Sequence, residues 1–269
     1  MKEKKEMSFL GHLEELRWLL VRSTIAVLIA GTATFFVSDF VFDQIIFGPT
    51  DVNFVTYHYF CELAQYFQLG DDLCIKEMPF IIQNTEMEGQ VNILVWTCVT
   101  SGFILAFPYI LWQVWKFVRP ALYEKERRGA VGFMIASTLL FFLGVLFGYY
   151  IVVPMSVNFF ATFQVSDKVV NHFSLDSYIS MIKTSVIASG LFFELPIVIF
   201  FLTKLGLVSA DMLRKYRKYA IVIVLIVAAI VTPPDVVTQV IVSIPMLLIY
   251  EASIFIAASV ERRAQKTAL

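Results

Sequence analysis

The hydrophobic residues of this chain occur in long uninterrupted runs. Residues 89–115 and 129–166 contain no Asp, Glu, Lys or Arg at all. A helix needs about 20 predominantly apolar residues to cross the hydrocarbon core of a bilayer. Soluble all-α proteins do not produce runs of this length. The pattern therefore predicts an all-α integral membrane protein with several transmembrane helices.

Six transmembrane helices are predicted within a single domain that covers residues 1–269. The third is expected to end where Pro154 would break it. The fifth is short, roughly 21 Å against a hydrocarbon core of about 30 Å. This mismatch predicts either local thinning of the bilayer or a longer, partly interfacial helix. The predicted spans are 18–40, 91–115, 129–153, 178–205, 219–232 and 236–259, with a long external segment at 41–90.

The basic residues alternate with the predicted spans in a way that fixes their orientation. Eighteen of the 21 Lys and Arg residues fall in four groups that alternation of the spans places on one side of the membrane: residues 1–22, 116–128, 204–218 and 262–266. Lys76, Lys168 and Lys183 fall on the other side, where the first segment is acidic. Because Lys and Arg are enriched in cytoplasmic loops, both termini are predicted to be cytoplasmic.

The overall composition agrees with this prediction. The chain is 58% hydrophobic and 16% charged, against about 25% charged in a typical soluble domain. A soluble fold of this length would leave large apolar patches exposed. The net charge of −1 gives no indication of nucleic-acid binding. Residues 1–6 mix lysines with acids, unlike a transit peptide, and the first apolar run is too long for a signal-peptide core, so we expect it to be retained.

Glu194 lies near the middle of the fourth predicted span. A carboxylate at this depth costs about 2.5 kcal/mol or more unless it is protonated or paired, so it is a candidate functional residue. The alternative is a neutral glutamic acid that is hydrogen-bonded within the bundle and serves packing alone. Pro196 frees a backbone carbonyl at a similar depth. Gln239, a second polar residue in an apolar span, could face Glu194 if the fourth and sixth spans line one cavity.

Two cytoplasmic segments, residues 12–17 and 117–128, place carboxylates among basic residues. They could be ordinary solvated charge runs with helical i,i+4 pairs. Alternatively, carboxylates held at a membrane surface by neighbouring arginines suit bidentate binding of an incoming guanidinium.

The cysteines and histidines suggest no catalytic or metal centre. Cys61 and Cys74 share the external segment, and a disulfide between them would contribute about 3 kcal/mol if that compartment is oxidising. Neither the cysteines nor the three scattered histidines have the spacing of a zinc site. Walker A, GxGxxG and GxSxG motifs are also absent from the sequence. We therefore expect a protein that is not an enzyme and that carries no cofactor.

Four motifs in this order resemble TatC, the receptor subunit of the twin-arginine protein translocase. The similarity extends over nearly the whole chain, with six helices in the order of the family. The motifs are His12-Leu13-x-Glu15-Leu16-Arg17, then Gln113-Val114-Trp115-x-Phe117-x-x-Pro120-Ala121-Leu122-Tyr123-x-x-Glu126-Arg127-Arg128, then Phe193-Glu194-x-Pro196, and finally Thr232-Pro233-Pro234-Asp235-x-x-x-Gln239.

The resemblance implies a cup-shaped six-helix bundle in the cytoplasmic (inner) membrane of a prokaryote, which binds the Arg-Arg signal peptides of folded exported proteins. In the family, carboxylates matching Glu15 and Glu126 lie in the patch that receives the two arginines. Phe117 and Pro120 shape this patch, and Arg17 belongs to the same site.

The resemblance also implies the partners of the chain. Residues matching Glu194 and Gln239 belong to the concave face that meets single-span membrane subunits of the TatA and TatB type. Oligomers with these subunits and with further copies of the chain are expected. The long external segment with Cys61 and Cys74 departs from the commoner members of the family.

A different class of function remains as an alternative at this point. A secondary transporter could use Glu194 as a proton or ion site. Such transporters often show two halves with matching interrupted helices, and this pattern is not evident in the sequence. An intramembrane enzyme would need a nucleophile with its base, or metal ligands, and the sequence suggests neither.

Overall fold

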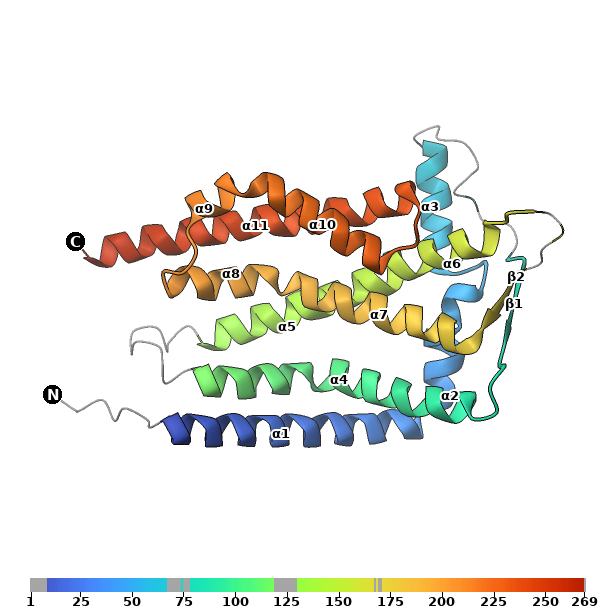
Figure 1. The fold of residues 1–269 in the computed structure, drawn as a ribbon, viewed down its shortest axis with the longest axis horizontal. Helices are drawn as coiled ribbons and strands as arrows, with labels where there is room; N and C mark the ends of the chain where they lie inside the picture. The colour runs from blue at the N-terminus through green and yellow to red at the C-terminus, as the bar shows by residue number, and fades with distance from the viewer. Residues whose placement is uncertain are drawn as a thin grey trace. The chain divides into compact units, whose positions relative to one another are not determined.

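The structure, a computed structural model, describes residues 9–66, 74, 78–118, 130–166, 168 and 171–268. These residues are almost entirely helical (Figure 1). Their contacts divide the chain into two units. Unit 1 combines residues 1–41 with 90–139, and unit 2 combines residues 42–89 with 140–269.

Within the described residues, five helical stretches are long and apolar enough to cross a membrane. They cover Leu13–Phe36, Gly89–Phe117, Met134–Thr162, Leu175–Lys204 and Thr238–Arg262. The predicted fold class, an all-α integral membrane protein, is confirmed. The fifth predicted span is α10, Arg217–Val231, which has 15 residues and a length of about 22 Å. The number of six spans therefore stays a prediction.

Unit 1 is built on two long helices that touch through glycines. Helix α1, Phe9–Phe36, is followed by the short α2, Ser38–Phe40, and packs against α4, Gly89–Val118. A Cβ atom added at Gly102 would lie 2.5 Å from the carbonyl oxygen of Val27, and one at Gly31 would lie 2.9 Å from that of Cys98. Only glycine allows the two backbones to come this close.

The third span is longer than predicted and runs from unit 1 into unit 2. Helix α5, Ala130–Phe147, continues through the π-helical turn η5, Gly148–Val152, into α6, Val153–Thr162. The prediction that Pro154 ends this span is therefore wrong. Pro154 occupies the first turn of α6, where the missing N–H matters least. The wider π-turn just before it is a common way to accommodate a helix irregularity.

The third and fourth spans touch along a line of small residues. Helix α7, Leu175–Phe193, packs against α5 and η5, and a Cβ atom added at Gly144 would lie 2.6 Å from the carbonyl oxygen of Ser189. At Gly148 the same atom would lie 2.8 Å from the carbonyl oxygen of Ser185. The two glycines form the GxxxG spacing that lets membrane helices approach closely.

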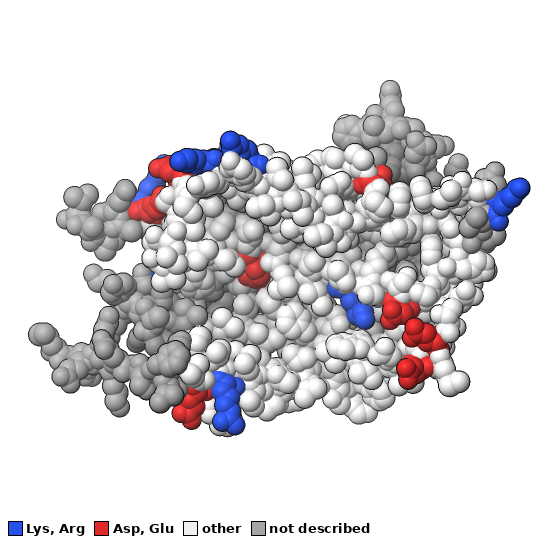
Figure 2. All heavy atoms as spheres, viewed as in Figure 1, with Lys and Arg blue, Asp and Glu red and all other residues white. Residues whose placement is uncertain are grey.

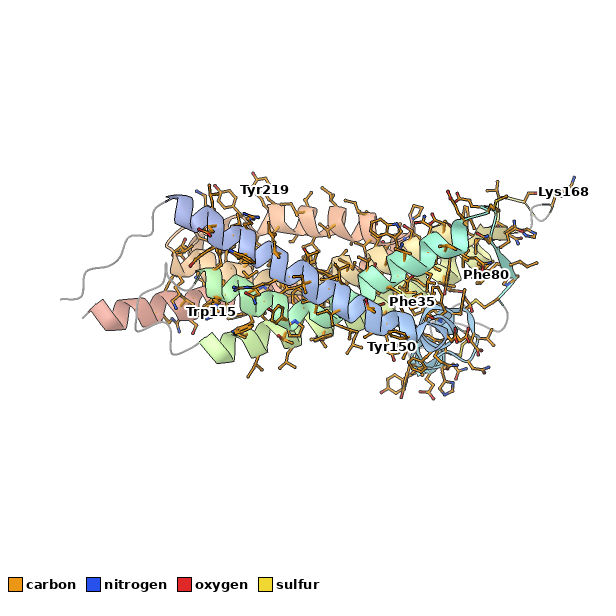
Figure 3. All side chains as sticks on the ribbon, turned by 90° about the horizontal axis from the view of Figure 1, so that it is seen from below. Phe35, Phe80, Trp115, Tyr150, Lys168 and Tyr219 are labelled. Atoms are coloured by element: carbon orange, nitrogen blue, oxygen red, sulfur yellow. A yellow bond between two sulfur atoms is a disulfide. The ribbon has the colours of Figure 1, made fainter. Side chains whose placement is uncertain are left out.

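The remaining helices of unit 2 close its core. Helix α7 is followed by α8, Leu195–Lys204, α9, Ala210–Lys215, α10, and α11, Val236–Ala268. Because Phe147, Phe193, Val242 and Met246 share one buried cluster, α5, α7 and α11 meet there. Figure 3 shows Lys168 and Phe80 at one end of unit 2 and Tyr219, near the start of α10, toward the other.

Hydroxyl groups bind the external segment within itself and to the helices of unit 2. It contains η1, Val41–Ile46, η2, Gly48–Thr50, α3, Val55–Tyr66, and β1, Phe80–Gln83, which pairs in parallel with β2, Asn171–Ser174. Three tyrosines each donate to a backbone carbonyl of the segment at 2.7 Å: Tyr57 to Pro49, Tyr149 to Ile45 and Tyr178 to Ile46. Burial raises the pKa of Tyr57 well above its usual value, so this phenol remains a donor at physiological pH.

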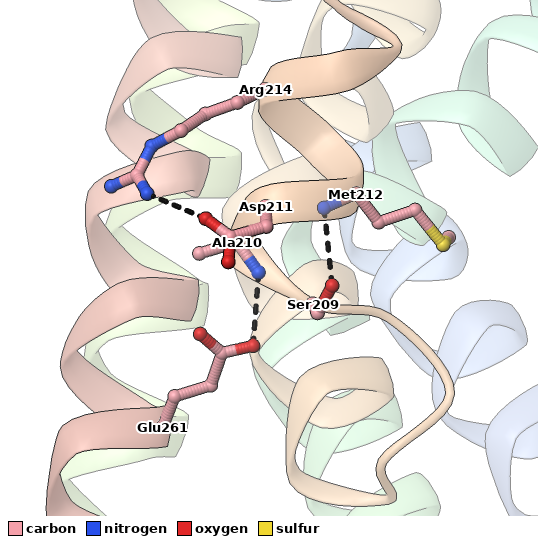
Figure 4. Close-up of polar contacts among 6 residues, drawn as sticks. All are labelled: Ser209, Ala210, Asp211, Met212, Arg214 and Glu261. Atoms are coloured by element: carbon pink, nitrogen blue, oxygen red, sulfur yellow. Dashed lines mark hydrogen bonds and ion pairs between the residues drawn. The ribbon is translucent and has the colours of Figure 1, made fainter.

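Polar contacts at the opposite end of unit 2 join α9 and the start of α10 to α11. The backbone N–H of Ala210, in the first turn of α9, donates to Glu261 Oε1 at 3.0 Å (Figure 4). Arg217 forms a bidentate ion pair with Glu251, in which Nε lies 2.7 Å from Oε1 and Nη2 lies 2.8 Å from Oε2. On the face shown in Figure 2, charged side chains gather mainly near helix ends, and uncharged side chains cover most of the surface between.

Candidate functional site

Unit 1 contains a groove of about 430 Å³ between the start of α1 and the end of α4. The positions along α1 that contribute to it recur every three or four residues, so they share one face of the helix. Carboxylate, aromatic and basic side chains all reach the groove. It is lined by Gly11, Glu14, Glu15, Trp18, Leu19, Arg22, Gln113, Lys116 and Phe117.

The charges of the groove are ordered along α1. Glu14 and Glu15 are exposed near the start of the helix, and Arg22 follows about 10 Å further along. Trp18 lies between them with 51% of its surface exposed. The guanidinium carbon of Arg22 lies 5.9 Å from the centre of the Trp18 ring. Among these side chains, the two carboxylates therefore lie nearest the N-terminus of α1.

This arrangement suits the binding of guanidinium groups. A carboxylate accepts two parallel hydrogen bonds from an arginine, and an aromatic face stabilises the cation above it. The contact between Arg22 and Trp18 is an example of the second interaction within the chain. An incoming arginine would find carboxylates at Glu14 and Glu15 and a further ring at Phe117.

The structure brings together some of the predicted site residues. Glu15 and Phe117, which are 102 positions apart, line the same groove. Arg17 is exposed and does not line it. Glu126 and Pro120 lie outside the described residues.

Glu194 lies in unit 2, at the junction between α7 and α8. It is the residue that ends the first helix and precedes the second, and only 8% of its surface is exposed. Its backbone carbonyl accepts hydrogen bonds from Ile197 and Val198 at 2.9 and 3.0 Å. Pro196 occupies the first turn of α8, so the missing N–H costs little there. A buried carboxylate is thus placed at a break within a spanning segment.

Gln239 is half-buried near the start of α11. Its side-chain nitrogen donates to the backbone carbonyl of Leu225 in α10 at 3.1 Å. Asp235 begins α11 by accepting hydrogen bonds from the backbone N–H and the hydroxyl of Thr238 at 2.8 and 2.7 Å. Gln239 thus binds the two helices of the short hairpin to each other.

The structure joins Cys61 of α3 to Cys74 by a disulfide, with their Cα atoms 4.5 Å apart. The link lies in the external segment and closes a loop of 13 positions. In the chain-entropy model such a loop contributes about 3 kcal/mol. Cys98, in α4, is buried and not part of a disulfide.

A family model described as "Sec-independent protein translocase protein (TatC)" matches residues 11–245 of the chain. The chain belongs to the TatC family. The matched region contains the described groove residues, Glu194 and Gln239. The resemblance inferred from the four sequence motifs is therefore confirmed.

Individual TatC proteins match over nearly their whole length. One from Blattabacterium sp. subsp. Periplaneta americana is 42% identical over 262 residues, which cover 97% of this chain and 98% of the relative. One from Aquifex aeolicus is 35% identical over 265 residues, or 97% and 98% of the two chains. A crystal structure described as the twin arginine translocase receptor TatC is 35% identical, with a TM-score of 0.70, and covers 93% of this chain and 99% of that one.

As a TatC protein, the chain is a multi-pass membrane component of the twin-arginine, Sec-independent protein translocase. TatC proteins are translocase components and not enzymes. The motifs of the sequence contained Glu15, Gln113 and Phe117 but not Trp18 or Arg22. Glu14, Trp18 and Arg22 follow one another at intervals of four residues, and this spacing could have placed Trp18 and Arg22 on the same helix face as Glu14.

Proposed function

We propose that this TatC chain is the signal-peptide receptor and assembly platform of its translocase. It binds the Arg-Arg segment of signal peptides that direct folded proteins to export. The groove of unit 1 contributes Glu15 to the site, and Glu15 and Glu126 accept the two guanidinium groups. Phe117 and Pro120 shape this site, and Arg17 lies on the same turn of α1 as the carboxylates.

The observation that carries this proposal is the pairing of acidic and aromatic side chains in one groove. Glu14 and Glu15 stand beside the rings of Trp18 and Phe117. A lysine ammonium could pair with one carboxylate, but it lacks the planar fork that pairs bidentately. The groove should therefore prefer Arg-Arg to Lys-Lys, which a merely solvated pair of glutamates would not do.

Removal of the carboxylates tests the site directly. We expect the double variant Glu15→Ala, Glu126→Ala to bind an Arg-Arg signal peptide about 10- to 100-fold more weakly, because two charge-assisted hydrogen-bonded contacts are lost. Binding is measured by titration of a fluorescent signal peptide onto the purified full chain, beside its Lys-Lys counterpart. Glu88→Ala, which removes an exposed carboxylate of unit 2, is the matched control. Unaltered affinity in the double variant would remove this groove from consideration.

We further propose that the chain crosses the cytoplasmic (inner) membrane of a prokaryote six times, with both termini in the cytoplasm. The distribution of 18 of its 21 basic residues supports this orientation. The short span is α10, whose 15 residues cross the membrane either where the bilayer is locally thin or with interfacial residues extending the helix. Its partners are single-span subunits of the TatA and TatB type and further copies of itself.

Cysteine labelling from outside sealed cells tests this topology. We expect a membrane-impermeant maleimide to label Glu86→Cys and Pro234→Cys, which are exposed beside β1 and in the turn between α10 and α11. Asp211→Cys, exposed in α9, should react only after the cells are opened. Labelling of position 211 from outside, or protection of position 234, would contradict the six-span arrangement.

A further inference from the structure

One face of α7 carries polar groups at three depths. At 100° per residue, positions 176, 183 and 194 lie within about 20° of one another around the helix axis. Asp176 is exposed, Lys183 is half-buried and Glu194 is buried. Ser180 is also exposed and lies on the same side. We call these four residues the polar face of α7.

Lys183 is the basic residue of this face. It lies in a stretch, Leu175–Lys204, that is apolar and long enough to cross a membrane. Its ammonium makes an ion pair or hydrogen bond with none of the residues that the structure describes. Asp176 is two turns away along the helix, about 10 Å. A cation inside an apolar helical segment is a candidate functional residue, because charged side chains are rare there.

A contact between helices gives the level of Lys183 within unit 2. The hydroxyl of Ser185 donates to the carbonyl of Val231, the last residue of α10, at 3.3 Å. Lys183 precedes Ser185 by two residues, or about 3 Å. It therefore lies level with the Pro233–Pro234 turn, where the short hairpin of α10 and α11 ends. Its side chain leans toward the start of α7, the external end.

The surface beside the polar face allows another helix to come close. A groove of about 620 Å³ lies among α6, α7 and the end of α10, and hydroxyl side chains line it together with aromatic and aliphatic ones and the carboxylate of Asp176. Ser180 and Thr184 of α7 are exposed there. Small and hydroxyl residues mark surfaces on which membrane helices pack. Lys183 does not line this groove, but it lies about 60° around the axis of α7 from Ser180, and its positive charge is complementary to a carboxylate.

We propose that the polar face of α7 receives a single-span partner helix, and that the Lys183 ammonium pairs with a carboxylate near the external end of that helix. The inference rests on the proposed assembly role and adds the contact at Lys183 to it. Glu194 lies eleven residues deeper along the same face, or about 16 Å along the helix.

Variants at position 183 test the pairing in the full chain co-expressed with the single-span subunits of its translocase. Lys183→Met keeps the apolar stem and removes the charge, and we expect about tenfold less subunit to co-purify in mild detergent. Lys183→Arg retains the charge and should recover the wild-type amount. Lys168→Met, which removes an exposed external lysine, is the matched control and should also behave as wild type. Wild-type recovery with Lys183→Met would overturn the proposal.

Charge exchange distinguishes a direct pair from an indirect effect. Lys183→Glu should lose the subunit, and changing one acidic residue in the outer third of the partner span to lysine should restore it. The proposal fails if no such combination restores recovery. It also fails if Lys183→Met loses bound anionic phospholipid in native mass spectrometry while keeping the subunit, since the ammonium would then serve a lipid headgroup.

Signal-peptide capture on the same preparations separates this proposal from the receptor role. Lys183→Met should capture an Arg-Arg peptide as well as the wild type, because the groove belongs to unit 1. Absence of Arg-Arg preference in the wild type would refute the receptor role itself. Intact capture together with unchanged subunit recovery in Lys183→Met would refute only the pairing at Lys183.

Discussion

Gly144→Ala is expected to lower the free energy of unfolding by about 2 to 3 kcal/mol, because it forces two packed helices apart. The added Cβ atom would lie 2.6 Å from the carbonyl oxygen of Ser189 and 2.8 Å from the Cα atom of Gly190. Both neighbours are backbone atoms, so no rotation of a side chain can relieve the overlap. The change is measured by denaturant titration of the detergent-solubilised protein, followed by circular dichroism.

Gly132 provides a matched control within the same helix, α5. A Cβ atom added at Gly132 meets none of the described atoms within 4 Å. Gly132→Ala should therefore be neutral or should stabilise the helix by up to about 1 kcal/mol, since alanine has the higher helix propensity. Equal unfolding midpoints for the two variants would show that the contact at Gly144 does not limit stability.

Glu194→Ala is expected to abolish transport while leaving signal-peptide capture unchanged. The carboxylate is buried at the junction of α7 and α8 in unit 2, whereas the groove that we propose for capture is in unit 1. A hydrogen bond between membrane helices contributes only about 0.6 to 2 kcal/mol, enough to orient a partner helix without holding it irreversibly. Transport is measured with a twin-arginine substrate in membrane vesicles, and capture by crosslinking to its signal peptide.

Glu194→Gln separates the two roles that the sequence leaves open. Glutamine keeps the hydrogen-bonding capacity and loses the ability to ionise. A docking role predicts substantial transport by this variant, whereas the proton site of a coupled transporter predicts that it is as inactive as alanine. Normal transport by Glu194→Ala would instead make the residue a packing feature.

The hydrophobic pattern predicted the long helices because membrane insertion depends on the local length of an apolar run. It placed the start of the fourth span within a few residues of α7. It did not predict that this span divides at Glu194, nor that the third span continues past Pro154 to Thr162. Proline is a strong local signal, but its effect depends on whether the preceding turn can widen, as η5 does.

The candidate site was predictable only in part. Glu15 and Phe117 could be predicted because each belongs to a short motif that can be recognised in the sequence alone. Trp18 and Lys116 were not singled out because their roles arise only when the start of α1 lies beside the end of α4. That contact depends on Gly31 and Gly102, 71 positions apart, which let the two backbones approach.

The sequence by itself determined that this chain has long membrane-spanning helices, that its basic residues segregate between the predicted spans, and that its motifs resemble those of TatC. Each follows from short segments, through apolar length, charge and residue spacing. Only the tertiary structure decided that Glu251 pairs with Arg217, that Glu261 receives the N–H of Ala210, and that Gly144 touches the backbone of Ser189. These contacts join residues 34 to 51 positions apart, and their existence depends on helix crossing geometry that no local pattern encodes.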